Sequence, residues 1–94
     1  MGFLEGSNKK MKDEIIVVGA HLDHVGMQGE TCLFPGADNN ASGVAAVLET
    51  ARLLSQAEEA PKRSVLFVFF SAAESQHLGA EIFVSNFSKL SKID

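Results

Sequence analysis

Three short polar segments hold the side chains of this chain that are best suited to chemistry. They are residues 21–24 (HLDH), 38–40 (DNN) and 72–74 (AAE). Imidazole nitrogens and carboxylate oxygens are ligands that suit zinc, so a histidine and carboxylates arriving from separate segments would form a metal site. Residues two apart in an extended chain share a face, which would allow Asp23 to fix the tautomer of His21. The pattern is therefore compatible with a metal site.

A purely structural explanation accounts for the same residues. Asn39 and Asn40 are of the type that caps the start of a helix. Glu74 would stabilise the N-terminus of a following helix through the helix dipole. A single histidine at the end of a strand is more often solvated or hydrogen-bonded than bound to a metal. Residue types alone leave both explanations open.

Two continuous apolar runs lie ahead of the first and third polar segments. Residues 14–20 and 64–71 are rich in β-branched and aromatic side chains, as strands are when both of their faces are covered. Between them, residues 42–57 repeat apolar side chains at helical spacing in one stripe: Val44, Val47, Leu48, Ala51 and Leu54. Pro61 prevents this helix from continuing. The order strand, helix, strand predicts a βαβ unit with a right-handed crossover.

Shorter elements complete the predicted fold. Residues 2–5 are expected to add a short strand, and residues 9–13 and 25–40 are expected to be loops. A second helix is expected over residues 75–87, with these side chains facing the sheet: Leu78, Ile82, Phe83 and Phe87. The predicted fold class is α/β, a single domain over residues 1–94 with three layers, in which helices flank a short, mostly parallel sheet.

The predicted order of elements brings the polar segments together. Ligands of open α/β sheets bind beyond the carboxyl ends of the strands. Residues 21–24 and 72–74 end the two predicted strands, and residues 38–40 open the first helix. The loop over residues 25–40 is long for a βα connection, and such loops are usually functional or disordered. We therefore expect the three segments to converge at one edge of the sheet.

Composition excludes several classes of protein. With 46% hydrophobic residues the chain is a folding sequence, and its net charge of −4 argues against nucleic-acid binding. The longest apolar run, residues 65–70, is too short to span a membrane. The polar residues 7–10 stand where a signal peptide would be apolar, so we expect a soluble protein without one. Cys32 is alone, so no internal disulfide forms, and we expect it to behave as a small hydrophobe.

Three motifs in this chain resemble those of the di-zinc aminopeptidase family, which includes bacterial leucyl aminopeptidases and glutamate carboxypeptidase. They are residues 17–23 (VVGAHLD), 35–43 (PGADNNASG) and 61–72 (PKRSVLFVFFSA), and the likeness covers nearly the whole chain. The resemblance implies an α/β fold with a mostly parallel sheet. It also implies removal of N-terminal residues from peptides by two zinc ions, which polarise the carbonyl and activate a water, with a glutamate as general base.

The resemblance assigns roles to single positions. His21 matches the first zinc ligand of the family, and Asp23 matches the residue that orients it. The bridging aspartate falls on Asn39 here. Glu74 keeps a ligand position, and the general base beside it has become Ala73.

Other positions depart from the family pattern or lie outside it. Asp38 precedes the bridging position, while His24 and His77 match no family ligand and are expected on the surface. The remaining family ligands, an aspartate and a histidine, are expected beyond this chain, and Asp94 is not equated with that aspartate. His21 and Glu74 could hold one metal ion weakly, together with Asp38, so zinc is expected to be absent or weakly bound.

These departures predict a catalytically inactive chain. A neutral amide does not bridge two cations, and loss of a general base typically slows a reaction by about 10²–10⁴-fold. The bare edges of a short sheet favour pairing with another chain, so we expect a homodimer or larger oligomer. Three alternatives stay open. They are an inactive aminopeptidase-like chain, a self-associating scaffold without catalysis, and a half-enzyme that a partner chain completes.

Overall fold

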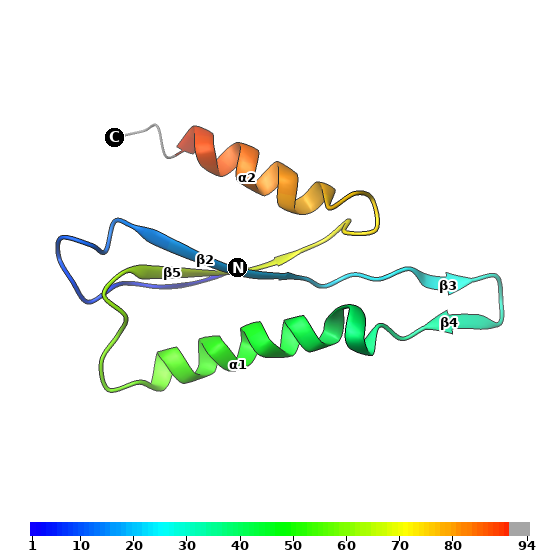
Figure 1. Ribbon diagram of the computed structural model, residues 1–94, viewed down its shortest axis with the longest axis horizontal. Helices are drawn as coiled ribbons and strands as arrows, with labels where there is room; N and C mark the ends of the chain where they lie inside the picture. The colour runs from blue at the N-terminus through cyan, green and yellow to red at the C-terminus, as the bar shows by residue number, and fades with distance from the viewer. Residues whose placement is uncertain (91–94) are drawn as a thin grey trace.

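The computed structural model describes residues 1–90, with side chains up to residue 87, so Asp94 lies outside the described residues. Figure 1 shows the elements along the chain. They are β1 (Gly2–Leu4), β2 (Ile15–His21), β3 (Gly26–Gln28), β4 (Cys32–Phe34), the π-helical turn η1 (Ala37–Ala41), α1 (Ser42–Gln56), β5 (Ser64–Phe70) and α2 (Leu78–Leu90).

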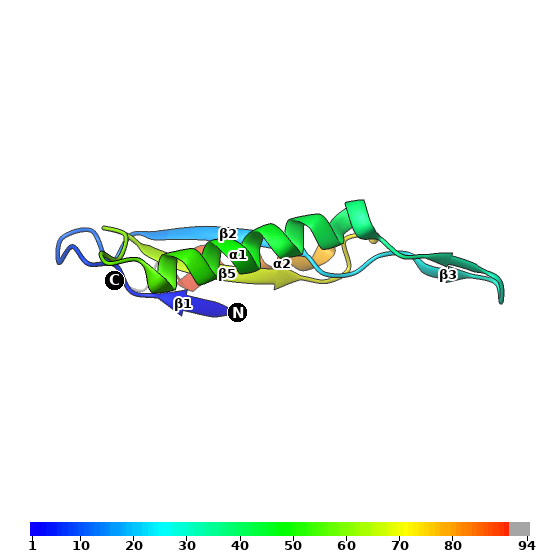
Figure 2. The same cartoon turned by 90° about the horizontal axis from the view of Figure 1, so that it is seen from below.

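The main sheet has the strand order β1-β5-β2. β5 is parallel to β2 in a register that runs from Ile15 opposite Ser64 to His21 opposite Phe70, and it is antiparallel to the shorter β1. The two helices lie on opposite sides of this sheet (Figures 1 and 2). The predicted α/β fold with flanking helices is confirmed, and the predicted strand near the N-terminus makes the sheet mixed.

The core forms where α1 packs on β5. Val47, Val65 and Phe67 are buried there, and six partly buried side chains surround them: Leu4, Val18, Ala20, Ala51, Leu54 and Phe69. β5 is buried because it has a strand on each side and a helix over its face. The prediction of a covered strand is therefore confirmed for residues 64–70, while Ser71 follows the strand and is exposed.

The same prediction is wrong for β2. Ile15, Ile16 and Val17 expose 39%, 48% and 41% of their surface. β2 pairs with β5 alone among the strands that the structure describes, so its outer edge lacks a neighbour. The composition of β2 correctly indicates an apolar strand. It does not indicate whether another element covers that strand.

Both predicted helices form, with differences at their ends and faces. α1 begins at Ser42 as predicted, and its Val47 packs on the sheet while Leu48 is exposed. α2 begins at Leu78 rather than at residue 75. Its start is delayed because residues 75–77 form a turn, in which Gln76 has φ 59° and cannot continue a right-handed helix.

The sheet-facing side of α2 is narrower than predicted. The rings of Phe83 and Phe70 lie edge to face with their centroids 5.5 Å apart, and Phe87 stacks on Phe83. Leu78 and Ile82 are exposed. The contact of Phe83 with Phe70 therefore places α2 against the end of β5.

The predicted loop over residues 25–40 contains a second, two-stranded sheet. β3 and β4 pair antiparallel as a hairpin, with Met27 opposite Leu33. Gly29 supplies the left-handed conformation that its turn needs, with φ 66°. The hairpin projects beyond the end of the main sheet (Figures 1 and 2). The prediction that residues 25–40 form a loop is therefore wrong for the strands at residues 26–28 and 32–34.

Across residues 1–90, neither helix has both the length and the apolar character needed to cross a membrane.

Candidate functional site

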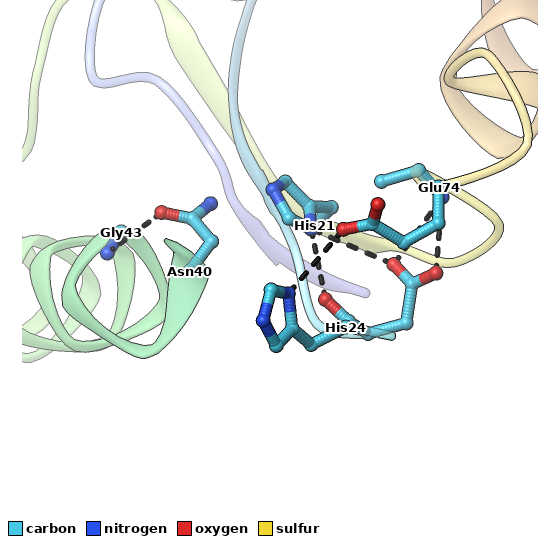
Figure 3. A network of polar contacts seen from close by, with 7 residues as sticks. His21, His24, Asn40, Gly43 and Glu74 are labelled. Atoms are coloured by element: carbon cyan, nitrogen blue, oxygen red, sulfur yellow. Dashed lines mark hydrogen bonds and ion pairs between the residues drawn. The ribbon is translucent and has the colours of Figure 1, made fainter. Parts of the chain in front are cut away.

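The parallel pairing of β2 and β5 places their carboxyl ends side by side. His21 lies opposite Phe70 at the last residue pair, and the N–H of Leu22 donates to the carbonyl of Phe70 at 2.8 Å. The chain segments that follow the two strands therefore leave the sheet at the same point. They bring residues 21–24 and 72–74 into one cluster (Figure 3).

Asp23 ties the two strand ends together. Its carboxylate accepts a hydrogen bond from the backbone N–H of Ala73, at 3.0 Å to Oδ2 and 3.3 Å to Oδ1. The Ala73 side chain is a methyl group that is 8% exposed. Asp23 is therefore a structural acceptor for the segment that carries Glu74, a contact that sequence reasoning did not find.

His21 lies within reach of two acceptors on Asp23. Its Nδ1 is 3.0 Å from the backbone carbonyl oxygen of Asp23 and 3.5 Å from carboxylate Oδ1. Donation from Nδ1–H to this carbonyl in the neutral ring leaves Nε2 with its lone pair, which is the form of imidazole that binds metals or takes up protons. The geometry places Asp23 beside His21 as the sequence predicted, with the backbone oxygen nearer than the side chain.

His24 contacts Glu74. Its Nδ1 lies 3.3 Å from Oε1 of that carboxylate, and its ring lies edge to face with Phe34, with the centroids 6.4 Å apart. The prediction that His24 is a surface residue is wrong, since its side chain is 22% exposed. One feature of the sequence could have indicated this contact. His24 belongs to residues 21–24, the segment that was expected to converge with Glu74. His77 is exposed, as predicted, and its ring lies 6.4 Å from that of His21.

The turn that presents Glu74 has unusual backbone conformations. Ala72, Gln76 and His77 have φ values of 58°, 59° and 58°, a region that residues other than glycine seldom occupy. Backbone hydrogen bonds close the turn, among them one from the N–H of His77 to the carbonyl of Ala73 at 2.9 Å. Conformations of this kind cluster at functional sites, where the surrounding structure holds them.

The third predicted segment opens α1. Asn40 Oδ1 accepts a hydrogen bond from the N–H of Gly43 at 3.2 Å, which is the capping role predicted for Asn39 or Asn40. The carbonyl of Asp38 accepts from the hydroxyl of Ser42 at 2.7 Å. Asp38 and Asn39 are exposed. Figure 3 shows Asn40 at the helix start, across His21 from Glu74.

The zinc site that the resemblance implies can be tested against these positions. Zinc sites in proteins use three or four side-chain ligands. Within residues 1–90, no three His, Cys, Asp or Glu residues come together in a group that could hold a metal ion. His21 and Glu74 are the two predicted ligands in the cluster, and an oxygen of Glu74 already faces His24. The described residues therefore do not fit a zinc centre of the family type.

Comparison with protein families identifies the chain. Residues 1–94 match the model of Peptidase family M28 along their whole length. The chain belongs to this family. Peptidase family M28 and its aminopeptidases are generally zinc-dependent.

Several curated proteins have similar sequences. The chain is 35% identical to "Uncharacterized protein YfbL" of Escherichia coli K12 over an alignment 86 residues long, which covers 84% of this chain and 26% of that protein. It is 33% identical to "Leucine aminopeptidase 1" of Paracoccidioides brasiliensis over 79 residues, covering 80% of this chain and 20% of that protein. "Leucine aminopeptidase 1" of Uncinocarpus reesii is 35% identical over 82 residues. The alignment covers 82% of this chain and 21% of that protein.

The chain thus spans about a quarter or less of the length of these curated relatives. No solved structure matches it. The resemblance to di-zinc aminopeptidases is confirmed at the level of the family.

Proposed function

We propose that this chain is a peptidase-like member of family M28 that carries one edge of an aminopeptidase-type site and does not hydrolyse peptide bonds by itself. The observation that supports this most directly is Ala73. The position to which the resemblance assigns the general base carries a methyl group, and its backbone N–H is engaged by Asp23. A methyl group cannot take a proton from water, and a lost general base typically slows a reaction by about 10²–10⁴-fold.

The segment at the start of α1 supports the same proposal. Asn39, the proposed bridging position, carries a neutral amide, and Asp38 is the only carboxylate of residues 37–41. A neutral amide does not compensate the charge of two zinc ions. Any metal that this chain holds is proposed to bind weakly, through His21 and Glu74 with Asp38 or Asn39 as an outer partner.

An assay of hydrolysis tests the proposal. The chain is incubated with zinc or cobalt and a chromogenic leucyl anilide, and turnover is compared with that of metal alone. We expect no turnover above the metal blank, and none from Ala73→Glu alone. Metal-dependent turnover by the unaltered chain would overturn the proposal.

The same assay examines the bridging position and the half-enzyme alternative. Ala73→Glu is combined either with Asn39→Asp or with Asp38→Asn, so that the two variants identify which position interacts with the metal. The unaltered chain and each variant are also mixed with a separate polypeptide that comprises the rest of a leucine aminopeptidase relative. Turnover that appears only in the mixture favours a half-enzyme that a partner completes.

A second candidate function is self-association without catalysis, and one observation favours it. The outer edge of β2 is free of a neighbouring strand within the described residues, and three apolar side chains there are 39–48% exposed. Free edges of this kind pair with another strand. The proposed occupant is β2 of a second copy, because two identical edges form a closed, two-fold contact.

Light scattering tests this candidate. We expect the unaltered chain to have the mass of a dimer or larger oligomer, and Ile16→Lys to shift it toward the monomer because a charge at an edge opposes pairing. Leu53→Lys on the exposed face of α1 is the matched control and should leave the mass unchanged. A monomeric mass for the unaltered chain at working concentration would rule the candidate out.

A further inference from the structure

His24 carries an unusual buried nitrogen. Among the described residues that are not exposed, its Nδ1 is the only side-chain nitrogen or oxygen that is buried without a hydrogen-bond partner. An unsatisfied buried polar atom typically destabilises a fold, so native structures rarely keep one without a reason. The nearest charged atom recorded for this nitrogen is Oε1 of Glu74, 3.3 Å away. A small adjustment of either side chain would therefore complete a hydrogen bond.

The ring of His24 is held from two other directions. Phe34, at the end of β4, packs against it at an interplanar angle of 76°. Gly36 lies so close that a Cβ at this position would be 3.0 Å from Cδ2 of the ring and 3.1 Å from Cγ. The absence of a side chain at residue 36 thus makes room for the imidazole. These contacts keep Nδ1 directed at Glu74.

We propose that His24 is a positioning residue, which donates a hydrogen bond from Nδ1–H to Oε1 of Glu74 and holds that carboxylate at the carboxyl end of β5. Hydrogen bonds to a charged acceptor are stronger than neutral ones, so one such contact is enough to orient a side chain. The bond leaves the second carboxylate oxygen of Glu74 available to a ligand. It also connects the base of the β3–β4 hairpin to the turn that carries Glu74.

Other charged groups nearby leave this pairing intact. Asp23 accepts from the backbone of Ala73, and His21 has its Nδ1 against the carbonyl of Asp23. His77 is exposed and has its ring against His21. The significance of the contact rests on the proposed role of Glu74 as a ligand position. The existence of the contact between His24 and Glu74 does not depend on that role. The experiments that test the contact therefore use neither metal nor peptide hydrolysis.

The first experiment determines the tautomer of His24 by nitrogen NMR of the full chain, at about pH 8, where an ordinary imidazole is neutral. We expect the proton of His24 on Nδ1. Replacement of the carboxylate in Glu74→Ala should shift His24 toward the Nε2–H tautomer that free imidazole prefers, and should leave His77 unchanged. A wild-type His24 with its proton on Nε2 would overturn the proposal without any variant being needed.

The second experiment uses a conservative rescue. His24→Asn can keep an N–H donor near the position of Nδ1, whereas His24→Leu removes it. We expect the folding equilibrium constant of the Asn variant to exceed that of the Leu variant by about fivefold, the value of one ordinary hydrogen bond. In a Glu74→Ala background this difference should vanish. An Asn variant no better than the Leu variant, or a difference that survives Glu74→Ala, would show that the ring acts only through packing.

Discussion

Ser64 is the only buried polar side chain among the described residues, with 0% of its surface exposed. Its hydroxyl donates to the carbonyl of Lys12 at 2.6 Å and accepts from the N–H of Gly6 at 2.9 Å. One hydroxyl at the start of β5 thus satisfies two backbone groups in the connection between β1 and β2. The segment has few apolar side chains of its own, so its position depends on these bonds together with the backbone bonds from Ser7 to Pro61 and from Asn8 to Lys62.

Ser64→Ala should therefore destabilise the chain by about 1–3 kcal/mol, because it leaves the N–H of Gly6 without its acceptor. The measurement is urea unfolding followed by circular dichroism. Ser55→Ala is the matched control, since that hydroxyl also donates to a carbonyl but lies exposed on α1. Equal effects of the two substitutions would show that burial of Ser64 does not matter.

The ion pair between Glu5 and Lys12 gives a pH dependence with a definite sign. Lys12 Nζ donates to Oε1 of Glu5 at 2.7 Å. This hydrogen bond and the positive charge lower the pKa of Glu5 below its ordinary value, and the same contact raises the pKa of Lys12. A carboxyl whose pKa is lower in the folded chain stabilises the fold above its unfolded pKa and loses that contribution as the pH falls through the folded pKa.

We accordingly expect the urea midpoints of the unaltered chain and Glu5→Gln to differ at neutral pH and to converge in acid. The pKa of Lys12 is raised in the folded chain, so on the alkaline side the ion pair continues to stabilise the fold until the pH rises through that folded pKa. Both groups are exposed, so added salt should diminish the difference. A difference that persists unchanged at low pH would contradict the ion-pair explanation.

Ala73 gives a prediction about the missing carboxylate. A glutamate at this nearly buried position would stand beside Glu74 and the carboxylate of Asp23. Like charges close together oppose ionisation, and burial adds to the effect. Ala73→Glu should therefore lower metal-free stability by about 1–3 kcal/mol, measured by thermal unfolding with a chelator present. Ala60→Glu, outside the cluster, is the control, and equal losses for both would contradict the repulsion argument.

At the scale of elements, the turn between β5 and α2 combines strain with close packing. Three residues in it have a left-handed backbone although none is glycine. The helix that follows approaches the strand end closely, since a Cβ on Gly79 would lie 2.1 Å from the carbonyl oxygen of Ser71. The turn is therefore set by its surroundings, namely the bond between Asp23 and Ala73 on one side and the phenylalanines of α2 on the other.

Gln76→Gly should stabilise the chain by up to about 1 kcal/mol, because glycine adopts φ 59° without the penalty that Cβ imposes. Ala45→Gly in the interior of α1 is the matched control and should destabilise by about 1 kcal/mol. Thermal unfolding of both variants measures the two signs. A loss of stability in Gln76→Gly would mean that the turn is not strained at this residue.

At the scale of the whole molecule, the packed apolar side chains are distributed unevenly. The molecule extends over 54 × 32 × 13 Å, and the β3–β4 hairpin projects from one end of it (Figure 2). The core lies at the other side, between α1 and β5. Local stability follows the number of packed apolar neighbours, so the two regions should open with different free energies.

Amide hydrogen exchange should show this difference. Amides of β5 are expected to exchange only through global unfolding, whereas those of β3 and β4 should be less protected by at least about tenfold. Ser64→Ala should lower protection in β5 and leave the hairpin unchanged. Equal protection in the two regions would mean that another element or a second copy covers the hairpin.

Much of this arrangement could be predicted from sequence because it depends on local pattern. The apolar periodicity of residues 42–57 and the run of valine, leucine and phenylalanine in residues 64–70 indicate α1 and β5 by local pattern alone. The convergence of residues 21–24 with 72–74 followed from the parallel order of the strands. The exposure of β2 and of Leu48 could not be predicted, because apolar composition does not state which element will cover it.

The sequence by itself determined the family, the α/β order of elements and the departures at Asn39 and Ala73, because motifs and side-chain types are properties of the chain alone. The tertiary structure decided the partners. It placed His24 against Glu74 and bonded Asp23 to the backbone of Ala73, and among residues 1–90 it left the outer edge of β2 without a neighbouring strand. The two contacts join residues that are about 50 positions apart in the sequence. The pairing of β2 with β5 brings these residues together, so no local sequence pattern encodes the contacts.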